Sequence, residues 1–270
     1  MITQFVAPWL GQGVSVTSTA LAWVAFAAAM VMLLPLAQLD VEGERADAAV
    51  LLAAVFPFAA IFGQSVALAL FFAAALAAFN NVRRQRWIVG GICGGVAAAS
   101  IPTGVFILPA LAWIGFRDRS TRTMPIIAAL LLTIAGCAAC LSYAYYVGGP
   151  PGGWIVAARA WGLQIAQAPW VPLVRLFTAT LPATEMMSGA VAFIALAAVP
   201  LVWWRLNGGY AIYMLAMLGL PLMSGHYDSL GRMCALLFPL FVLAATIRSR
   251  VVVMLLAVTS AMFYAIALAL

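Results

Sequence analysis

The sequence contains no lysine, only one histidine and few charges of either sign. All thirteen basic residues are arginine, seven residues are acidic, and 67% of the chain is hydrophobic. Soluble domains are about half apolar, so this composition excludes an ordinary soluble core. With so few histidine and acidic side chains, we expect no metal centre. The composition predicts a multi-pass membrane protein, in which each charge away from the cytoplasmic loops is costly and needs a reason.

Several familiar patterns are also missing. No Walker or Rossmann glycine pattern occurs, and the single histidine, His226, gives no basis for a Ser-His-Asp arrangement. The centres of the apolar segments hold almost no charge and no two related halves are visible, which disfavours a transporter. The net charge of +6 reflects arginine bias toward one membrane face and attraction to anionic lipid. We therefore expect a bilayer partner and no nucleic acid.

Long apolar segments fill most of the chain, and a spanning helix needs about 20 such residues. Their hydrophobicity does not alternate, which favours helices over a β-barrel. The predicted fold class is all-α: a polytopic transmembrane helical bundle of about 8–10 segments, some broken or re-entrant, in one domain over residues 1–270. The expected segments are residues 16–38, 49–63, 65–80, 87–116, 125–147, 187–204, 209–224, 233–247 and 251–270.

The arginines predict how the segments are oriented. Ten of the thirteen fall at one face, which is cytoplasmic by the positive-inside rule, and Arg159, Arg175 and Arg232 remain for the other. Because arginines flank residues 87–116 on both sides, that segment must enter the membrane and return, with its turn at residues 100–104, where proline and glycine permit a reversal. One kinked 30-residue span is the alternative, and it would invert everything downstream.

Small residues inside the apolar segments predict packing and no chemistry. Gly90-Gly91 and Gly94-Gly95 have the spacing of closely packed membrane helices. Cys137 and Cys140 have C-x-x-C spacing, but a redox or zinc site would need polar neighbours and solvent. We interpret these cysteines as small packing residues.

Residues 148–186 form the one long connection, placed on the non-cytoplasmic face. Tryptophans in it, including Trp161 and Trp170, are spaced as interfacial anchors. We expect a short amphipathic helix in the headgroup layer. The functional alternative is a lid over a lipid-linked substrate, in which Trp161, Gln164 and Gln167 face a cavity.

Polar groups cluster in residues 224–232, which read Ser-Gly-His-Tyr-Asp-Ser-Leu-Gly-Arg. This stretch holds His226, Arg232 and Asp228, and only Glu185 joins Asp228 as an acid of the arginine-poor face. An arginine near the end of a span can bind a phosphate bidentately, and His226 or Asp228 can transfer a proton. The alternative is a loop in which Asp228 simply pairs with Arg232.

Three stretches carry a resemblance to a known family. Residues 54–62 read AVFPFAAIF and precede Leu70-Phe71, residues 87–109 contain WIVGG, IPTG and LP, and residues 229–241 contain SLGR and LFPLF. In this order they resemble the PIG-V-like mannosyltransferases, polytopic enzymes of the GT-C glycosyltransferase superfamily. Gly63-Gln64-Ser65 before an apolar run also resembles the polyprenol-phosphate-mannose transferases of that superfamily.

The resemblance implies transfer of a sugar, often mannose, from a polyprenyl-phosphate carrier to an acceptor that the sequence does not identify. The reaction is an inverting displacement at the non-cytoplasmic face, and the lipid-linked sugar is the donor substrate, with no bound cofactor. Such a reaction needs a carboxylate to activate the acceptor hydroxyl and cationic groups to stabilise the leaving phosphate.

The chain departs from the family at two charged positions, having Leu68 in place of a glutamate and Ile101 in place of an arginine. The family's acidic outside loop lies upstream of anything aligned here. We therefore expect either a chain that lacks its N-terminal segment or a shortened relative without that base.

The leading hypothesis is a membrane glycosyltransferase of the bacterial cytoplasmic membrane. The alternative is a non-catalytic or truncated relative that acts as a membrane subunit with a partner, and a small-solute transporter is the third class. The candidate catalytic residues are Asp228 and His226, and the candidate carrier- and substrate-binding residues are Arg232, Tyr227, Gln64, Thr103, Trp161 and Gln164.

Overall fold

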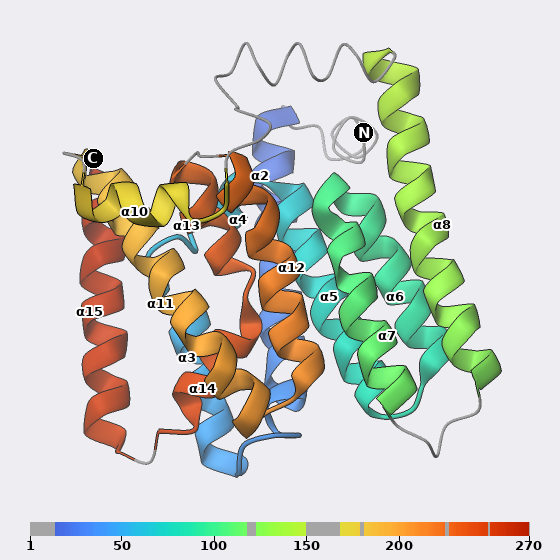
Figure 1. The fold of residues 1–270 in the computed structure, drawn as a ribbon, viewed down its shortest axis with the longest axis horizontal. Helices are drawn as coiled ribbons and strands as arrows, with labels where there is room; N and C mark the ends of the chain where they lie inside the picture. Colours follow the sequence, from blue (N-terminus) through green and yellow to red (C-terminus); the bar gives the residue numbers. More distant parts are fainter. Residues whose placement is uncertain are drawn as a thin grey trace.

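A computed structural model describes residues 14–117, 123–149, 168–178, 181–224, 227–247 and 249–269. Every regular element within these ranges is helical, which confirms the all-α prediction. Figure 1 shows most helices running up and down one bundle. The four that are long and apolar enough to cross a membrane are α2 (Val14–Ala37), α5 (Val66–Arg83), α8 (Thr123–Gly148) and α11 (Ala183–Arg205).

Residues 87–117 form the predicted hairpin, made of α6 (Trp87–Ser100), the 3₁₀ helix η2 (Pro102–Ile107) and α7 (Leu108–Arg117). A Cβ atom on Gly115, near the end of α7, would lie 2.9 Å from the Trp87 ring at the start of α6. The reversal begins at Ile101, which is extended, as expected before a proline. The chain therefore enters and returns, and the single kinked span is excluded.

The expected segment 49–63 is discontinuous. After the short 3₁₀ helix η1 (Gly43–Arg45), helix α3 (Ala46–Ala54) ends, and α4 (Ile61–Gln64) begins only after a turn around Pro57. Proline has no amide hydrogen and disfavours helical geometry in the residue before it, so a helix does not continue through this turn.

The polar stretch before Arg232 is helical from Tyr227 onward, whereas the alternative interpretation was a loop. α12 (Gly208–Ser224) is followed by α13 (Tyr227–Ala235) and α14 (Phe238–Ala245). The expected segment 233–247 is therefore interrupted, because Pro239 cannot donate a hydrogen bond to the preceding turn.

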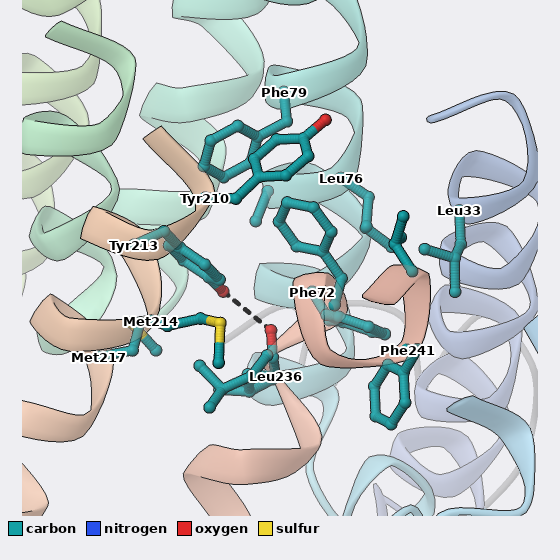
Figure 2. Packing of buried hydrophobic residues seen from close by; sticks show 14 of the residues in the cluster. Leu33, Phe72, Leu76, Phe79, Tyr210, Tyr213, Met214, Met217, Leu236 and Phe241 are labelled. Carbon is teal, nitrogen blue, oxygen red and sulfur yellow. Dashed lines mark hydrogen bonds between the residues drawn. The ribbon is translucent and has the colours of Figure 1, made fainter. Parts of the chain in front are cut away.

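Two donors satisfy the backbone at this interruption. The Leu236 carbonyl accepts from the Tyr213 hydroxyl at 3.0 Å and from the Phe238 amide at 3.0 Å; Figure 2 shows the tyrosine bond. Tyr213 is fully buried. Its ring packs against Phe79 and Phe238, at centroid separations of 5.3 and 5.5 Å, and Tyr210 packs against the same two rings from 5.6 and 5.0 Å.

The glycine pairs of α6 serve packing, as predicted. A Cβ atom on Gly95 would lie 2.8 Å from the Leu132 carbonyl oxygen of α8, and one on Gly94 would lie 2.5 Å from the Thr133 hydroxyl. A Cβ atom on Gly136 would overlap the Gly95 backbone. Glycine on both helices lets their backbones approach without side chains between them.

The described arginines divide between the two ends of the bundle as the sequence predicts. Figure 1 places the ends of α5, α7 and α11 and the beginning of α15 (Arg250–Ala269) at one end, which we call the arginine-rich end. α10 (Val171–Thr178), which carries Arg175, lies across the opposite, arginine-poor end together with the start of α13. That the arginine-rich end is cytoplasmic stays a prediction.

Candidate functional site

A cavity of about 350 Å³ lies at the arginine-poor end, where α4, the first turns of α11 and α13 converge. It brings together two of the candidate residues, Gln64 and Arg232, which are 168 positions apart in the sequence numbering. The other lining residues are Pro57, Phe58, Ala60, Ile61, Thr184, Met187 and Ser188. One wall is therefore apolar, and the rest offers a guanidinium, an amide and two hydroxyls.

Close packing of α13 places Arg232 at this cavity. A Cβ atom on the preceding residue, Gly231, would lie 2.5 Å from the Phe58 ring and 2.8 Å from the Ser188 hydroxyl, so only glycine allows this approach. Arg232 is exposed and makes no hydrogen bond or ion pair with another residue in the described part of the chain. A guanidinium can bind a phosphate through two parallel hydrogen bonds.

Gln64 is the last residue of α4 and is exposed into the same cavity. The next residue, Ser65, caps α5 by accepting a hydrogen bond from the Leu68 amide at 3.3 Å. The end of α4 is thus held by the start of α5, and the Gln64 amide can donate and accept hydrogen bonds with a polar ligand.

Tyr227 has a positioning contact and does not line the cavity. Its buried hydroxyl donates to the Pro172 carbonyl at 2.7 Å, which ties the start of α13 to α10. Burial raises the pKa of this hydroxyl above its ordinary value. Tyr227 therefore fixes α10 across this end of the bundle, next to the cavity that Arg232 lines.

The remaining candidates are not brought to this cavity by the described residues. Thr103 is half-buried in η2 and is not among the lining residues. Asp228 belongs to α13, four positions before Arg232, but its side chain is outside the described part, so its pairing with Arg232 stays untested. His226, Trp161 and Gln164 lie outside the described residues.

Sequence reasoning missed Thr184 and Ser188. Both lie in the first turns of α11, and the Ser188 hydroxyl donates to the Thr184 carbonyl at 2.9 Å. The available signal was their spacing of four, which puts two hydroxyls on one face of a helix. Among the described residues, no group of three or more His, Cys, Asp or Glu side chains could hold a metal ion.

No protein-family model, curated protein or solved structure matches the chain significantly.

Proposed function

We propose that this chain is a glycosyltransferase of the bacterial cytoplasmic membrane that transfers a sugar, mannose in the first instance, from a polyprenyl-phosphate carrier. The observation that supports the proposal is the cavity at the arginine-poor end, where Arg232, which has no ion-pair partner among the described residues, and Gln64 line the same space beside an apolar wall. This end is the one that the arginine bias assigns to the non-cytoplasmic face.

The proposed roles follow from the chemistry of the side chains. Arg232 binds the phosphate, which becomes the leaving group as the bond from the anomeric carbon to its oxygen breaks. The Gln64 amide orients a sugar hydroxyl, and the wall around Phe58 and Ile61 covers the first isoprene units. The acceptor hydroxyl forms the new bond, and we assign Asp228, supported by His226, to take its proton.

The experiment uses the purified chain in proteoliposomes with radiolabelled polyprenyl-phosphate mannose and a mixture of lipid-soluble acceptors. Replacing Arg232→Ala should lower transfer about 100-fold or more, the effect of removing one donor to a developing charge. Arg232→Lys keeps the charge but not the bidentate geometry and should be intermediate. Arg175→Ala at the same end is the matched control and should stay within about twofold. Full activity of Arg232→Ala would contradict the assignment of Arg232 to the carrier phosphate.

A non-catalytic membrane subunit is the second candidate, and one observation favours it. Leu68 and Ile101, which stand where the resembled family has charges, are both packed against the hydrophobic core. This candidate predicts no transfer by the chain alone and restored transfer when a complete transferase of the same membrane is added. Solute flux into the same proteoliposomes would instead indicate a transporter.

A further inference from the structure

A second cavity lies at the opposite, arginine-rich end. It has a volume of about 910 Å³ and is lined by residues of η1 and α3, the end of α14, Ile247 after it, and the first turns of α15. This volume falls in the range of about 300–1,000 Å³ that is typical of small-molecule sites. Arg232 lines a different cavity at the other end of the bundle, so a ligand here is independent of the proposed sugar transfer.

One side of this cavity is apolar. Leu51 of α3 and Val253 and Met254 of α15 line it; Val253 is buried, whereas Leu51 is 48% and Met254 64% exposed. The two helices are in contact, and Leu51 and Met254 leave an exposed apolar surface beside this contact. In a membrane, an open apolar slot between two helices is the place where a lipid acyl chain can lie without displacing water-exposed groups.

The other side of the cavity is charged with both signs. Glu42, Arg45 and Asp47 line it, and all three are exposed. Within the described ranges the one ion pair joins Arg83 to Asp40, so these three charges have none. Their sum is one negative charge, although the surrounding end of the bundle is basic.

We propose that this cavity binds one phospholipid whose headgroup carries both a phosphate and a primary ammonium group, as in phosphatidylethanolamine. The phosphate accepts hydrogen bonds from the Arg45 guanidinium, and the ammonium donates to the carboxylates of Glu42 and Asp47. An acyl chain lies in the slot between Leu51 and Met254.

The charges select this headgroup over the two obvious competitors. An anionic headgroup such as phosphatidylglycerol offers nothing positive to Glu42 and Asp47 and is repelled by them. Phosphatidylcholine has the same net charge as phosphatidylethanolamine, but its trimethylated nitrogen has no N–H to donate, whereas a primary ammonium has three. The expected order of affinity is ethanolamine, then choline, then glycerol.

Native mass spectrometry of the whole chain in detergent tests this order. Palmitoyl-oleoyl phosphatidylethanolamine, phosphatidylcholine and phosphatidylglycerol are each titrated, and the first bound lipid is quantified. The double variant Glu42→Gln, Asp47→Asn should bind the ethanolamine lipid about tenfold more weakly and lose its preference over choline, a change that corresponds to about 1.4 kcal/mol. Arg45→Ala should weaken the binding of both the ethanolamine lipid and the choline lipid. Glu185→Gln, at the other end of the bundle, is the control for loss of an acid and should change nothing.

Two results would overturn the proposal. One is that the wild-type protein binds the glycerol lipid as tightly as the ethanolamine lipid. The arginine-rich end would then attract lipids only through its net positive charge. The other is a double variant that keeps the full ethanolamine preference. Helical content of each variant is checked by circular dichroism, and the single variants Glu42→Gln and Asp47→Asn, each expected to show part of the loss, replace the double variant if it does not fold.

Discussion

Arg83 forms a bidentate ion pair with Asp40, which lies 43 residues earlier in the chain. Its Nη2 donates to Asp40 Oδ1 at 2.9 Å, and its Nη1 donates to Oδ2 at 3.1 Å and to the Tyr210 hydroxyl at 2.9 Å. The Asp40 side chain is 8% exposed and that of Arg83 19%. One guanidinium thus joins the end of α5, the turn after α2 and the start of α12 at the arginine-rich end.

Breaking this ion pair should destabilise the fold strongly. Asp40→Ala leaves the Arg83 guanidinium without its carboxylate in a mostly desolvated site, so we expect a loss on the order of 3 kcal/mol in the free energy of unfolding. The measurement is reversible unfolding by denaturing detergent in mixed micelles. Arg84→Ala is the control: Arg84 is exposed and should change stability by about 0.5 kcal/mol or less.

A double-mutant cycle separates the pair from the individual side chains. Because Asp40→Ala and Arg83→Ala remove the same contact, their combination should cost much less than the sum of the two single losses. Additive losses would mean that the two side chains act independently and that the observed pairing contributes nothing to stability.

Parts of this fold were predictable because the sequence carries a local signal for them. Arginines on both sides of residues 87–116 predicted that both ends of the segment lie at the same face. Pro102 and Gly104 indicated where the chain reverses its direction. The glycine pairs of α6 likewise predicted a close contact with another helix, but they did not identify α8 as that helix. In the candidate site, Arg232 and Gln64 were identified separately, by charge scarcity and by resemblance.

Other features have no local signal. From the sequence, Arg83 was counted only as one of the arginines in a cytoplasmic loop. Its ion pair with Asp40 could not be predicted, because it depends on how α2 and α5 pack. For residues 227–232 a loop was the alternative interpretation, but the stretch is helical, and the missing side chain of Gly231 lets α13 approach Phe58. The joint cavity of Gln64 and Arg232 likewise required the packing of three helices.

The contact between α6 and α8 should tolerate no added methyl group at its centre. Gly136→Ala places a Cβ atom onto the Gly95 backbone, which cannot move aside like a flexible side chain, and overpacking of this kind costs about 1–3 kcal/mol. The matched control is Gly219→Ala in α12, whose Cβ would meet nothing within 4 Å. That change should be neutral or add up to about 1 kcal/mol, because alanine favours the helix.

The same micelle unfolding assay compares the two alanine variants. Since both are Gly→Ala changes inside helices, their intrinsic helix propensities cancel in the difference. Equal effects at Gly136 and Gly219 would contradict close backbone packing between α6 and α8.

The Tyr213 hydroxyl should stabilise the interruption between α13 and α14. Tyr213→Phe removes one of two hydrogen bonds to the Leu236 carbonyl and leaves the one from the Phe238 amide, so the expected cost is about 1 kcal/mol. Hydrogen exchange should speed up for amides around this break. Tyr143→Phe, at an exposed position of α8, is the control and should alter neither measurement. A Tyr213→Phe protein as stable as wild type would show that the break needs no side-chain donor.

The division of arginines predicts which positions face each side of the membrane. A cysteine-free background is first made by replacing Cys93, Cys137, Cys140 and Cys234 with alanine. In it, Arg86→Cys and Arg117→Cys, at the two ends of the α6–α7 hairpin, should react with a membrane-impermeant maleimide only in inverted vesicles, whereas Arg175→Cys should react only in intact spheroplasts. Labelling of the first two from opposite sides would contradict the hairpin. Labelling of all three with the reverse preference would keep the hairpin but invert the orientation, and would move the Arg232 cavity to the cytoplasmic face.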